Sequence, residues 1–505
     1  MQAVAVEVLP GRGRVMVGML LAIGLAAMDA TIVATAVPSI AKDLGGFSRY
    51  EWLFSAYLLT QAVVTPIYGK LADVFGRRPV LVAGVLVFLT GSALGAIAWS
   101  MWALIAFRAL QGIGAGGIQP LVMTLAGDLY TLEERPRVQG QIASVWAFAA
   151  IAGPATGGLF AEYVSWRWIF IVNLPVGAVA LAVILANLRE PELVRREHRL
   201  DLPGALVLVV GAGLLVFGLL QGGVSWSWGS HASVLVFAGA ALSLLVFALQ
   251  ERRAVEPMLP PWLLTRRVLL FAALSSLAVG VLMIGTTTFV PVYAQGVLGL
   301  GPVAAGFVLA AMLLGWSGTA SFAGRLYLPF GFRNTALIGA SIAIAGGVLL
   351  SIMLGRAHLW LTIVACALMG AGVGLQATPV VIGVQSVIDW GRRGVATGSL
   401  MFMRTLGQAV GAGVLGAVAN AKLGSWFRNA PPAVAARLPN AGVNAATSVL
   451  GSGRNRVHGA AARYAERGVE LATHDVFLGM AACTLFALVV VLALPRVFAQ
   501  QEFGD

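Results

Sequence analysis

A single carboxylate stands in the first long apolar stretch of the chain. Asp29 lies within residues 15–40, which contain no other ionisable side chain. An ionised side chain at bilayer depth costs about 2.5 to 3.5 kcal/mol even on the most lenient insertion scale, so such residues usually face water or a partner and carry a function. The protonation of a carboxyl group changes readily when its surroundings alternate between apolar and hydrated. Asp29 therefore predicts ion-coupled transport.

A second polar set follows helical spacing within residues 102–126. The residues that recur every three or four positions, and so share one helix face, are Arg108, Gln111, Ala115 and Gln119. We expect this face to meet a cavity or a partner helix. Two interpretations of Asp29 stay open: alternating protonation, with Arg108 or water stabilising the anion, and a permanent salt bridge between Asp29 and Arg108 that joins two helices.

The segment 69–78 reads Gly-Lys-Leu-Ala-Asp-Val-Phe-Gly-Arg-Arg. Its glycines permit a tight turn and close helix approach, and its acid can join the neighbouring basic side chains in a charge cluster that breaks when two halves of the protein separate. Anchoring at the membrane surface explains the arginines but neither the acid nor the glycine spacing. We predict a cytoplasmic gate formed by Gly69, Asp73, Gly76, Arg77 and Arg78.

Residues 153–158 read Gly-Pro-Ala-Thr-Gly-Gly inside another apolar stretch. Proline within a helix removes a backbone hydrogen bond, and neighbouring glycines permit a bend and close contact with a second helix. This pattern predicts a hinge and packing element made of Gly153, Pro154, Gly157 and Gly158.

Polar and aromatic side chains within apolar stretches are candidates for a substrate cavity. Such residues also join helices or lie at the membrane interface, and both interpretations stay open. The candidates are Tyr57, Gln61, Gln111, Gln119, Trp146, Arg404 and Gln408, of which Arg404 is the strongest. One buried acid against two buried arginines favours neutral, zwitterionic or anionic amphipathic substrates over dications.

Composition defines the class of protein that must position these groups. The 505 residues are 59% hydrophobic and 11% charged, whereas soluble proteins carry about a quarter charged residues. No alternating ten-residue pattern indicates a barrel. We predict an all-α polytopic membrane protein with fourteen transmembrane helices, at about 15–39, 51–70, 79–99, 102–126, 140–162, 167–188, 203–221, 232–250, 269–295, 302–323, 335–354, 359–382, 395–419 and 475–495.

Charge placement predicts orientation and partners. Basic residues are concentrated in alternate connections between the predicted helices. Connections rich in Lys and Arg usually lie in the cytoplasm, so we predict that both termini are cytoplasmic. The net charge of +12 comes from these dispersed anchors, which argues against a nucleic-acid partner. The five histidines fall in loops or at the ends of the apolar stretches, so we expect no metal site and no membrane-embedded enzyme. The expected partners are a small amphipathic substrate and the lipid bilayer. We expect no cofactor other than the coupling proton, and we expect the functional unit to be a monomer.

The chain repeats itself. An offset of 258 residues aligns Gly112, Gly114 and Gly116 with Gly370, Gly372 and Gly374, and an offset of 255 aligns the gate segment with residues 324–333. Consistent offsets over neighbouring stretches indicate two homologous halves.

We predict three parts on this basis. Residues 1–200 form an N-terminal six-helix bundle, 201–267 contain two inserted helices and a linker, and 268–505 form a C-terminal six-helix bundle. The last part contains the one long polar outer loop, at about 420–474. This loop could cap the outer mouth, dock an accessory protein or be disordered, and all three interpretations stay open. Residues 459–469 predict a helix that leads into the last span.

The gate segment resembles a signature of the major facilitator superfamily. The strings around Asp29 and Gly153, together with Trp166-Arg-Trp168 and Asn173-Leu-Pro175, resemble its fourteen-span drug:proton antiporter branch. The resemblance implies the major facilitator fold, a gate joined by Asp128, an Arg108 that assists proton transfer, and a 153–158 element typical of exporters. The sequence departs from the family pattern in two places, with Ala149 where glycine is usual and Leu328 in place of the acid in the second copy of the gate, which implies an asymmetric gate.

The resemblance further implies a proton-coupled exporter of amphipathic drugs or antibiotics that works by alternating access across a bacterial cytoplasmic membrane. Export of an endogenous lipid, a siderophore or a self-made antibiotic is the alternative. A lateral opening lined by apolar side chains would favour lipid, and a closed aqueous vestibule would favour a soluble drug.

Overall fold

The computed structural model describes residues 12–44, 51–189, 201–222, 226–254, 262–353, 358–435 and 459–498. In these ranges the regular elements are all helices, and one isolated bridge joins Gly222 and Trp226. The all-α prediction is confirmed.

The helices of the first half, in chain order, are α1 (Arg12–Leu44), α2 (Glu51–Phe75), α3 (Arg77–Ala96), α4 (Met101–Leu129), α5 (Arg135–Tyr163), α6 (Trp168–Ile171) and α7 (Asn173–Asn187). The middle of the chain forms α8 (Leu202–Gln221), α9 (His231–Glu251) and the short α10 (Trp262–Thr265). The second half contains α11 (Arg267–Gly296), α12 (Pro302–Phe330), α13 (Phe332–Ser351), α14 (Leu359–Val387), the 3₁₀ turn η2 (Trp390–Arg392), α15 (Arg393–Arg428), α16 (Pro432–Ala435) and α18 (Ala460–Leu492).

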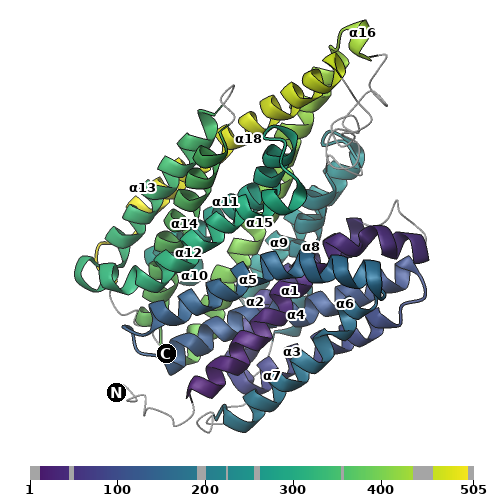
Figure 1. Ribbon diagram of the computed structural model, residues 1–505. Coiled ribbons are helices and arrows are strands. Elements are labelled where there is room, and N and C mark those ends of the chain that lie inside the picture. The colour runs from purple at the N-terminus through teal and green to yellow at the C-terminus, as the bar shows by residue number, and fades with distance from the viewer. Residues whose placement is uncertain are drawn as a thin grey trace.

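The packing of the helices repeats between the two halves. In the first half α1 packs on α5 and α7, while α4 packs on α2 and α3. The same pairs recur in the second half, where α11 packs on α15 and α18, while α14 packs on α12 and α13. The two groups form two bundles, with α8 and α9 beside their junction, where α8 contacts α2 and α15 (Figure 1).

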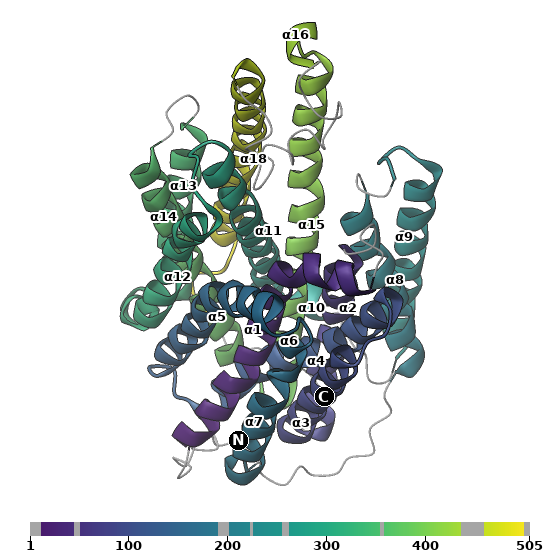
Figure 2. The same ribbon diagram turned by 45° about the vertical axis from the view of Figure 1, so that its right-hand side comes forward.

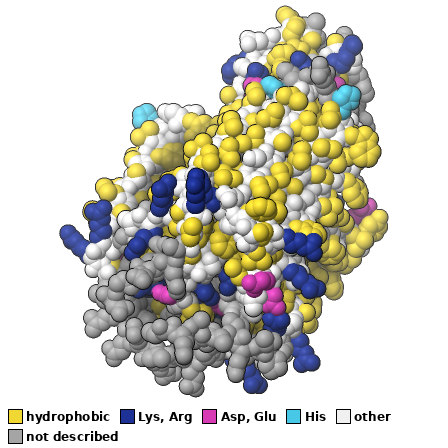
Figure 3. All heavy atoms as spheres, turned by 90° about the vertical axis from the view of Figure 1, so that its left-hand side faces the viewer, with side chains coloured by type: hydrophobic (Ala, Val, Ile, Leu, Met, Phe, Trp, Pro, Cys, Tyr) yellow, Lys and Arg dark blue, Asp and Glu magenta, His cyan; other side chains and the backbone are white. Residues whose placement is uncertain are grey.

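Twelve helices of the described chain are long and apolar enough to cross a membrane. Every one of the fourteen predicted stretches coincides with a helix, but α2 is not among the twelve, and the apolar core of α8 is the shorter Pro203–Leu219. Hydrophobic side chains cover a broad band of the face drawn in Figure 3, and Lys and Arg side chains lie mainly toward the edges of that band.

Two glycines set equivalent turns in the two halves. Gly76 separates α2 from α3 with φ 94°, and Gly331 separates α12 from α13 with φ 82°. Glycine adopts this left-handed region without the steric penalty that a Cβ atom brings. The two positions differ by the offset of 255 found in the sequence, so the repeat extends to backbone conformation.

The prediction of a long outer loop at 420–474 is corrected at both of its ends. Helix α15 continues to Arg428, and α18 begins at Ala460, so both helices project beyond the others at one end (Figure 2). The Trp426 and Tyr464 rings stack at 4.8 Å, and the Tyr464 hydroxyl donates to the Trp426 carbonyl at 2.8 Å. These contacts join the two extensions. The helix predicted at 459–469 is confirmed, and residues 436–458 lie outside the described part.

Candidate functional site

Asp29 is fully buried in the first bundle. One carboxylate oxygen accepts a hydrogen bond from Arg108 Nη1, and the other accepts from Gln111 Nε2 at 2.8 Å and from Asn173 Nδ2 at 3.3 Å. Arg108 and Gln111 come from α4, and Asn173 begins α7. The acid on α1 is therefore held by donors from two other helices, of which one is charged and two are neutral amides.

A further layer of contacts fixes these donors. Ser92 of α3 accepts from Gln111 at 2.6 Å and from Asn173 at 3.2 Å. Helix α3 reaches this position because Gly91 has no side chain, since a Cβ atom there would stand 2.7 Å from the backbone nitrogen of Gln111. Four helices of the first bundle thus meet around one carboxylate.

Arg108 has other partners besides Asp29. Its Nε donates to the carbonyl of Leu53 at 3.2 Å, and Nη1 also donates to Gln111 Oε1 at 2.7 Å. The guanidinium carbon lies 4.2 Å from the centre of the Tyr57 ring, within the range of a cation–π contact. Because these groups are neutral, they can hold the guanidinium whether or not Asp29 is charged.

This geometry sorts the predicted residues. The salt bridge between Asp29 and Arg108, one of the two interpretations of Asp29, is formed in this conformation. Tyr57 and Gln111, predicted as cavity residues, lie in the Asp29 network. Sequence reasoning gave Ser92 and Asn173 no role, although an amide in the apolar stretch 167–188 was a usable signal.

Asp73, one of the residues predicted for the gate, contacts the second half. Its two oxygens accept from the backbone N–H groups of Gly394 at 2.9 Å and Val395 at 2.7 Å, in the first turn of α15. A carboxylate at a helix N-terminus satisfies free N–H groups and opposes the positive end of the helix dipole. Burial raises the pKa of Asp73 to about 7, against the opposing effects of Arg77 and of the two backbone N–H groups.

Arg77 is the centre of the same cluster and is fully buried. Its guanidinium nitrogens lie 3.2 Å from Asp73 and 3.2 Å from Asp128, and one of them donates to the carbonyl of Trp390 at 2.5 Å. Arg393 forms an ion pair with Asp128 at 3.0 Å. The structure therefore brings Asp73, Arg77 and Asp128 together and adds the second-half residues Trp390 and Arg393, which sequence reasoning missed.

Arg78 does not join this cluster. It donates to the carbonyl of Leu185 at 2.7 Å, at the end of α7 in its own bundle. Gly69, in contrast, lies at the contact between the halves, because a Cβ atom there would stand 2.5 Å from the Gly394 carbonyl oxygen.

The predicted hinge is a close contact between α5 and α1. Gly153 leaves room for the Thr31 hydroxyl, which donates to the Ala149 carbonyl at 2.9 Å. Gly157 is buried, and a Cβ atom at Gly158 would meet nothing within 4 Å. Helix α5 continues through the segment, and the side chain of Pro154 lies outside the described part.

The remaining cavity candidates lie on helices that contact the opposite bundle. Contacts between the bundles run from α2 to α15, from α5 to α12, and from α4 to α14 and α15. The half-buried candidates on these helices are Gln61, Gln119, Trp146 and Gln408. The Trp146 Nε1 group is buried without an acceptor among the described residues.

Arg404 differs from the other arginines at membrane depth. Its side chain is buried, with 8% of the residue exposed, and it forms no hydrogen bond or ion pair within the described chain. Its side-chain nitrogens are not fully enclosed by protein, so they keep some accessible surface.

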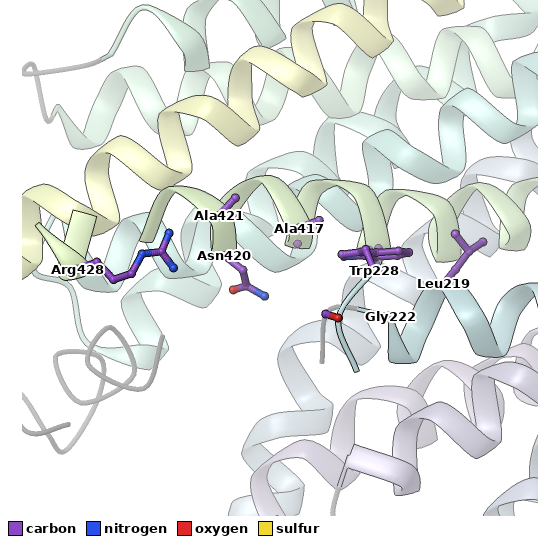
Figure 4. A pocket seen from close by; sticks show the side chains of 11 residues that line it. Leu219, Gly222, Trp228, Ala417, Asn420, Ala421 and Arg428 are labelled. Atoms are coloured by element: carbon purple, nitrogen blue, oxygen red, sulfur yellow. The ribbon is translucent and has the colours of Figure 1, made fainter. Parts of the chain in front are cut away.

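A separate cavity of about 630 Å³ lies between the C-terminal half of α15 and the connection from α8 to α9 (Figure 4). Its lining is mostly small or apolar, with polar groups toward one end, and consists of Leu219, Gly222, Ser227, Trp228, Ala412, Gly413, Gly416, Ala417, Asn420, Ala421 and Arg428. None of the residues predicted for the substrate cavity lines it. We call it the outer pocket.

Comparison with known proteins places this architecture in a family. The sequence profile of the Major Facilitator Superfamily matches residues 19–412. The chain belongs to this superfamily. Membership makes it a membrane transporter rather than an enzyme.

Relatives include efflux proteins from bacteria and fungi. The chain is 35% identical to the multidrug transporter protein MdtP of Bacillus subtilis over 81% of this chain and 75% of MdtP, and 34% identical to multidrug resistance protein 3 of the same organism over 80% and 79%. It is 32% identical to the efflux pump dotC of Dothistroma septosporum over 78% of this chain and 69% of that protein.

A solved structure supports the fold. The human organic anion transporter MFSD10 aligns with a TM-score of 0.60 over 95% of this chain and all of that chain, at 17% identity. The expected major facilitator fold is confirmed.

Proposed function

We propose that this superfamily member exports small amphipathic compounds across a bacterial cytoplasmic membrane in exchange for protons. The observation that carries the proposal is the Asp29 network, in which a fully buried carboxylate is held by one cation and two neutral amides. An acid at this depth in a transporter is suited to bind and release a proton as its surroundings change. The names of the multidrug and efflux relatives agree with this direction of transport.

The contacts of Arg108 make proton binding feasible. When Asp29 takes up a proton, Arg108 loses its charged partner but keeps the Leu53 carbonyl, the Gln111 amide oxygen and the Tyr57 ring. A buried cation without such groups would be strongly destabilised. Protonation can therefore release the salt bridge without leaving Arg108 unsolvated.

Alternating access needs a gate that opens and closes. Two contacts close one end of the bundles: Asp73 with the first turn of α15, and Arg77 with Trp390. We infer that this is the cytoplasmic end and that the conformation is closed toward the cytoplasm. Separation of the two bundles would then expose the substrate path on that side.

The proposed topology has fourteen crossings with both termini in the cytoplasm. Twelve of them are the helices that meet the length and hydropathy limits. The other two are α2, which belongs to the first bundle and contacts α15, and α8, which contacts both of these helices. The basic residues that support this orientation include Arg77 and Arg78 after α2 and Arg392 and Arg393 before α15.

The test is transport of a panel of dyes and antibiotics into inside-out vesicles with an imposed pH gradient. Asp29→Asn should abolish accumulation driven by the gradient but keep exchange of substrate between the two sides, because the cavity and gate remain. Asp43→Asn is the matched control on the same helix, since Asp43 is an exposed acid paired with Arg167 at 2.6 Å. Full proton-driven accumulation by a folded Asp29→Asn protein would contradict the proposal, and loss of exchange as well would favour a purely structural salt bridge.

Export of an endogenous amphipath is the second candidate, and the outer pocket favours it. This pocket is lined mainly by apolar and small residues beside the inserted pair α8 and α9. Such a lining suits an acyl chain better than a soluble drug. A labelled phospholipid added to the same vesicles decides between the two: transport of the lipid without transport of the dyes would favour this candidate.

A further inference from the structure

The second bundle holds a buried cation that has no counter-ion among the described residues. Arg404 lies eleven residues into α15, or about 16 Å along the helix axis from its first residue, so it is too deep for its charge to reach the membrane surface. Its guanidinium donates no hydrogen bond and forms no ion pair within the described chain. A buried charge of this kind is unfavourable unless water or a ligand compensates it.

Within the described chain, no acid forms an ion pair with Arg404. Between residues 268 and 435 the sequence contains one acidic residue, Asp389, and it precedes η2 and α15. On the helices of the first half, Asp29 pairs with Arg108, while Asp73 and Asp128 pair with Arg77. These acids are therefore already compensated by other cations.

The backbone around Arg404 is held tightly on its α11 side. A Cβ atom at Gly280 would collide with the Arg404 carbonyl oxygen, and a Cβ atom at Gly407 would collide with the Leu277 carbonyl oxygen. Such close backbone contact fixes the rotation of α15 against α11. Arg404 is therefore presented by a rigid helix rather than by a loop that can move it elsewhere.

We propose that Arg404 binds an acidic group of the transported compound, such as a carboxylate, sulfonate or phosphate. The planar guanidinium donates two parallel hydrogen bonds to these groups, and such charge-assisted bonds are about twice as strong as neutral ones. The inference rests on the proposed export function and names its substrate class: an amphipath with one anionic end. Arg108 is unsuited to this task because Asp29, Gln111, Leu53 and Tyr57 already engage it.

The test uses two dyes that share one ring system. 1-Anilinonaphthalene-8-sulfonate carries a sulfonate, and N-phenyl-1-naphthylamine lacks it. Binding to the purified protein in detergent is measured for the wild type, Arg404→Gln and Arg404→Lys, followed by transport in inside-out vesicles. Arg253→Gln is the control, because Arg253 is exposed in the connection after α9.

We expect the wild type to bind the sulfonate dye more tightly than the neutral one. Arg404→Gln should weaken binding of the sulfonate dye by about tenfold or more and leave the neutral dye within about twofold, since loss of a charge-assisted bond acts on the anion alone. Arg404→Lys should restore part of the affinity, and Arg253→Gln should change neither dye.

Equal binding of both dyes by the wild type, or an equal effect of Arg404→Gln on both, would overturn the inference. If Arg404→Gln fails to fold, the selectivity of the wild type and of Arg404→Lys decides the question. Failure of the proposed function has a different signature: the wild type would then transport neither dye under a pH gradient, whatever its binding selectivity.

Discussion

Two pairs of helices close the same end of the molecule by different chemistry. Helix α2 meets α15 where a Cβ atom at Gly69 would stand 2.5 Å from the Gly394 carbonyl oxygen. Helix α12 meets α5 where a Cβ atom at Gly324 would stand 2.6 Å from the Pro136 ring. The sequence offsets of 255 and 258 relate Gly69 to Gly324 and Pro136 to Gly394, so these are equivalent contacts of the repeat.

The second contact lacks both the acid and one of the backbone N–H groups that bind it in the first contact. Asp73 accepts from the N–H groups of Gly394 and Val395. At the equivalent positions the second contact has Leu328 in place of the acid and Pro136 in place of Gly394. Proline has no N–H group to donate, so an acid at Leu328 would lack half of its backbone partners. The missing acid of the second gate copy therefore has a physical reason on the opposite helix.

In both contacts a side chain donates a hydrogen bond to a backbone carbonyl of the opposite half, but the type of side chain differs. Arg77 donates to the Trp390 carbonyl, and the Tyr327 hydroxyl donates to the Leu132 carbonyl at the equivalent loop position. The residue equivalent to Arg77 is Phe332, whose ring lies 4.9 Å from that of Tyr327. One contact is thus ionic and the other aromatic, and only the ionic one should respond to pH.

The largest difference between the two contacts should come from Arg77→Met. It leaves the buried carboxylates of Asp73 and Asp128 without their shared cation, and breaking such a pair costs about 3 to 5 kcal/mol. Phe332→Leu at the equivalent position should cost under about 1.5 kcal/mol. Denaturant unfolding in detergent measures both, and similar losses in the two variants would remove the distinction.

The next effect is a pH dependence confined to the ionic contact. The closed arrangement raises the pKa of Asp73 from an ordinary value of 3.8 to about 7, because the group is buried. A closed conformation therefore binds a proton at Asp73 more tightly than an open, hydrated one, so this contribution to closure is present at low pH and is lost as the pH rises through about 7. We expect the closed population to grow between pH 8 and pH 6.

Spin-label distances between Phe75→Cys and Phe330→Cys measure this population, in a background where Cys366 and Cys483 are replaced by Ala. These two positions are exposed and equivalent in the repeat. Asp73→Asn, which cannot ionise, should weaken this pH dependence, and the remainder should come from Asp128, whose pKa burial also raises. The same profile in Asp73→Asn, or a closed population that grows on raising the pH, would contradict the assignment.

The smallest effect should come from Tyr327→Phe in the aromatic contact. It removes one hydrogen bond to the Leu132 carbonyl, worth about 0.5 to 1.5 kcal/mol. The closed population should fall by less than about tenfold, equally at all pH values. Tyr293→Phe is the control, because the Tyr293 hydroxyl is buried without a partner among the described residues. A loss in Tyr327→Phe as large as in Arg77→Met would mean that the aromatic contact dominates.

Much of this arrangement is predictable from the sequence. The spacing of Arg108 and Gln111 on one helix face and the isolation of Asp29 predict a polar meeting point, since helical periodicity and the cost of a buried charge are local rules. The glycine offsets predict the repeat for the same reason. The partners Ser92 and Asn173 were not predicted, because their importance depends on which helices pack together.

The gate shows the same limit. Asp73 and Arg77 are recognisable from their spacing, whereas their partners Gly394 and Trp390 lie more than 300 residues away in the chain and meet them only when the bundles pack together. The polar residues after position 419 predict that the helix ends there, yet α15 continues to Arg428, and Trp426 in this extension stacks on Tyr464. Tertiary contacts overrode local polarity there.

The uncompensated charge of Arg404 also bears on the energetics of export. If a monoanion bound there leaves the cell while one proton enters, two elementary charges move across the membrane in the same electrical direction. A membrane voltage of about 100 mV, negative inside, contributes about 2.3 kcal/mol for each charge, which together sustains a concentration ratio on the order of a thousandfold. Such an exchange generates current, and voltage alone drives it even when the pH is equal on both sides.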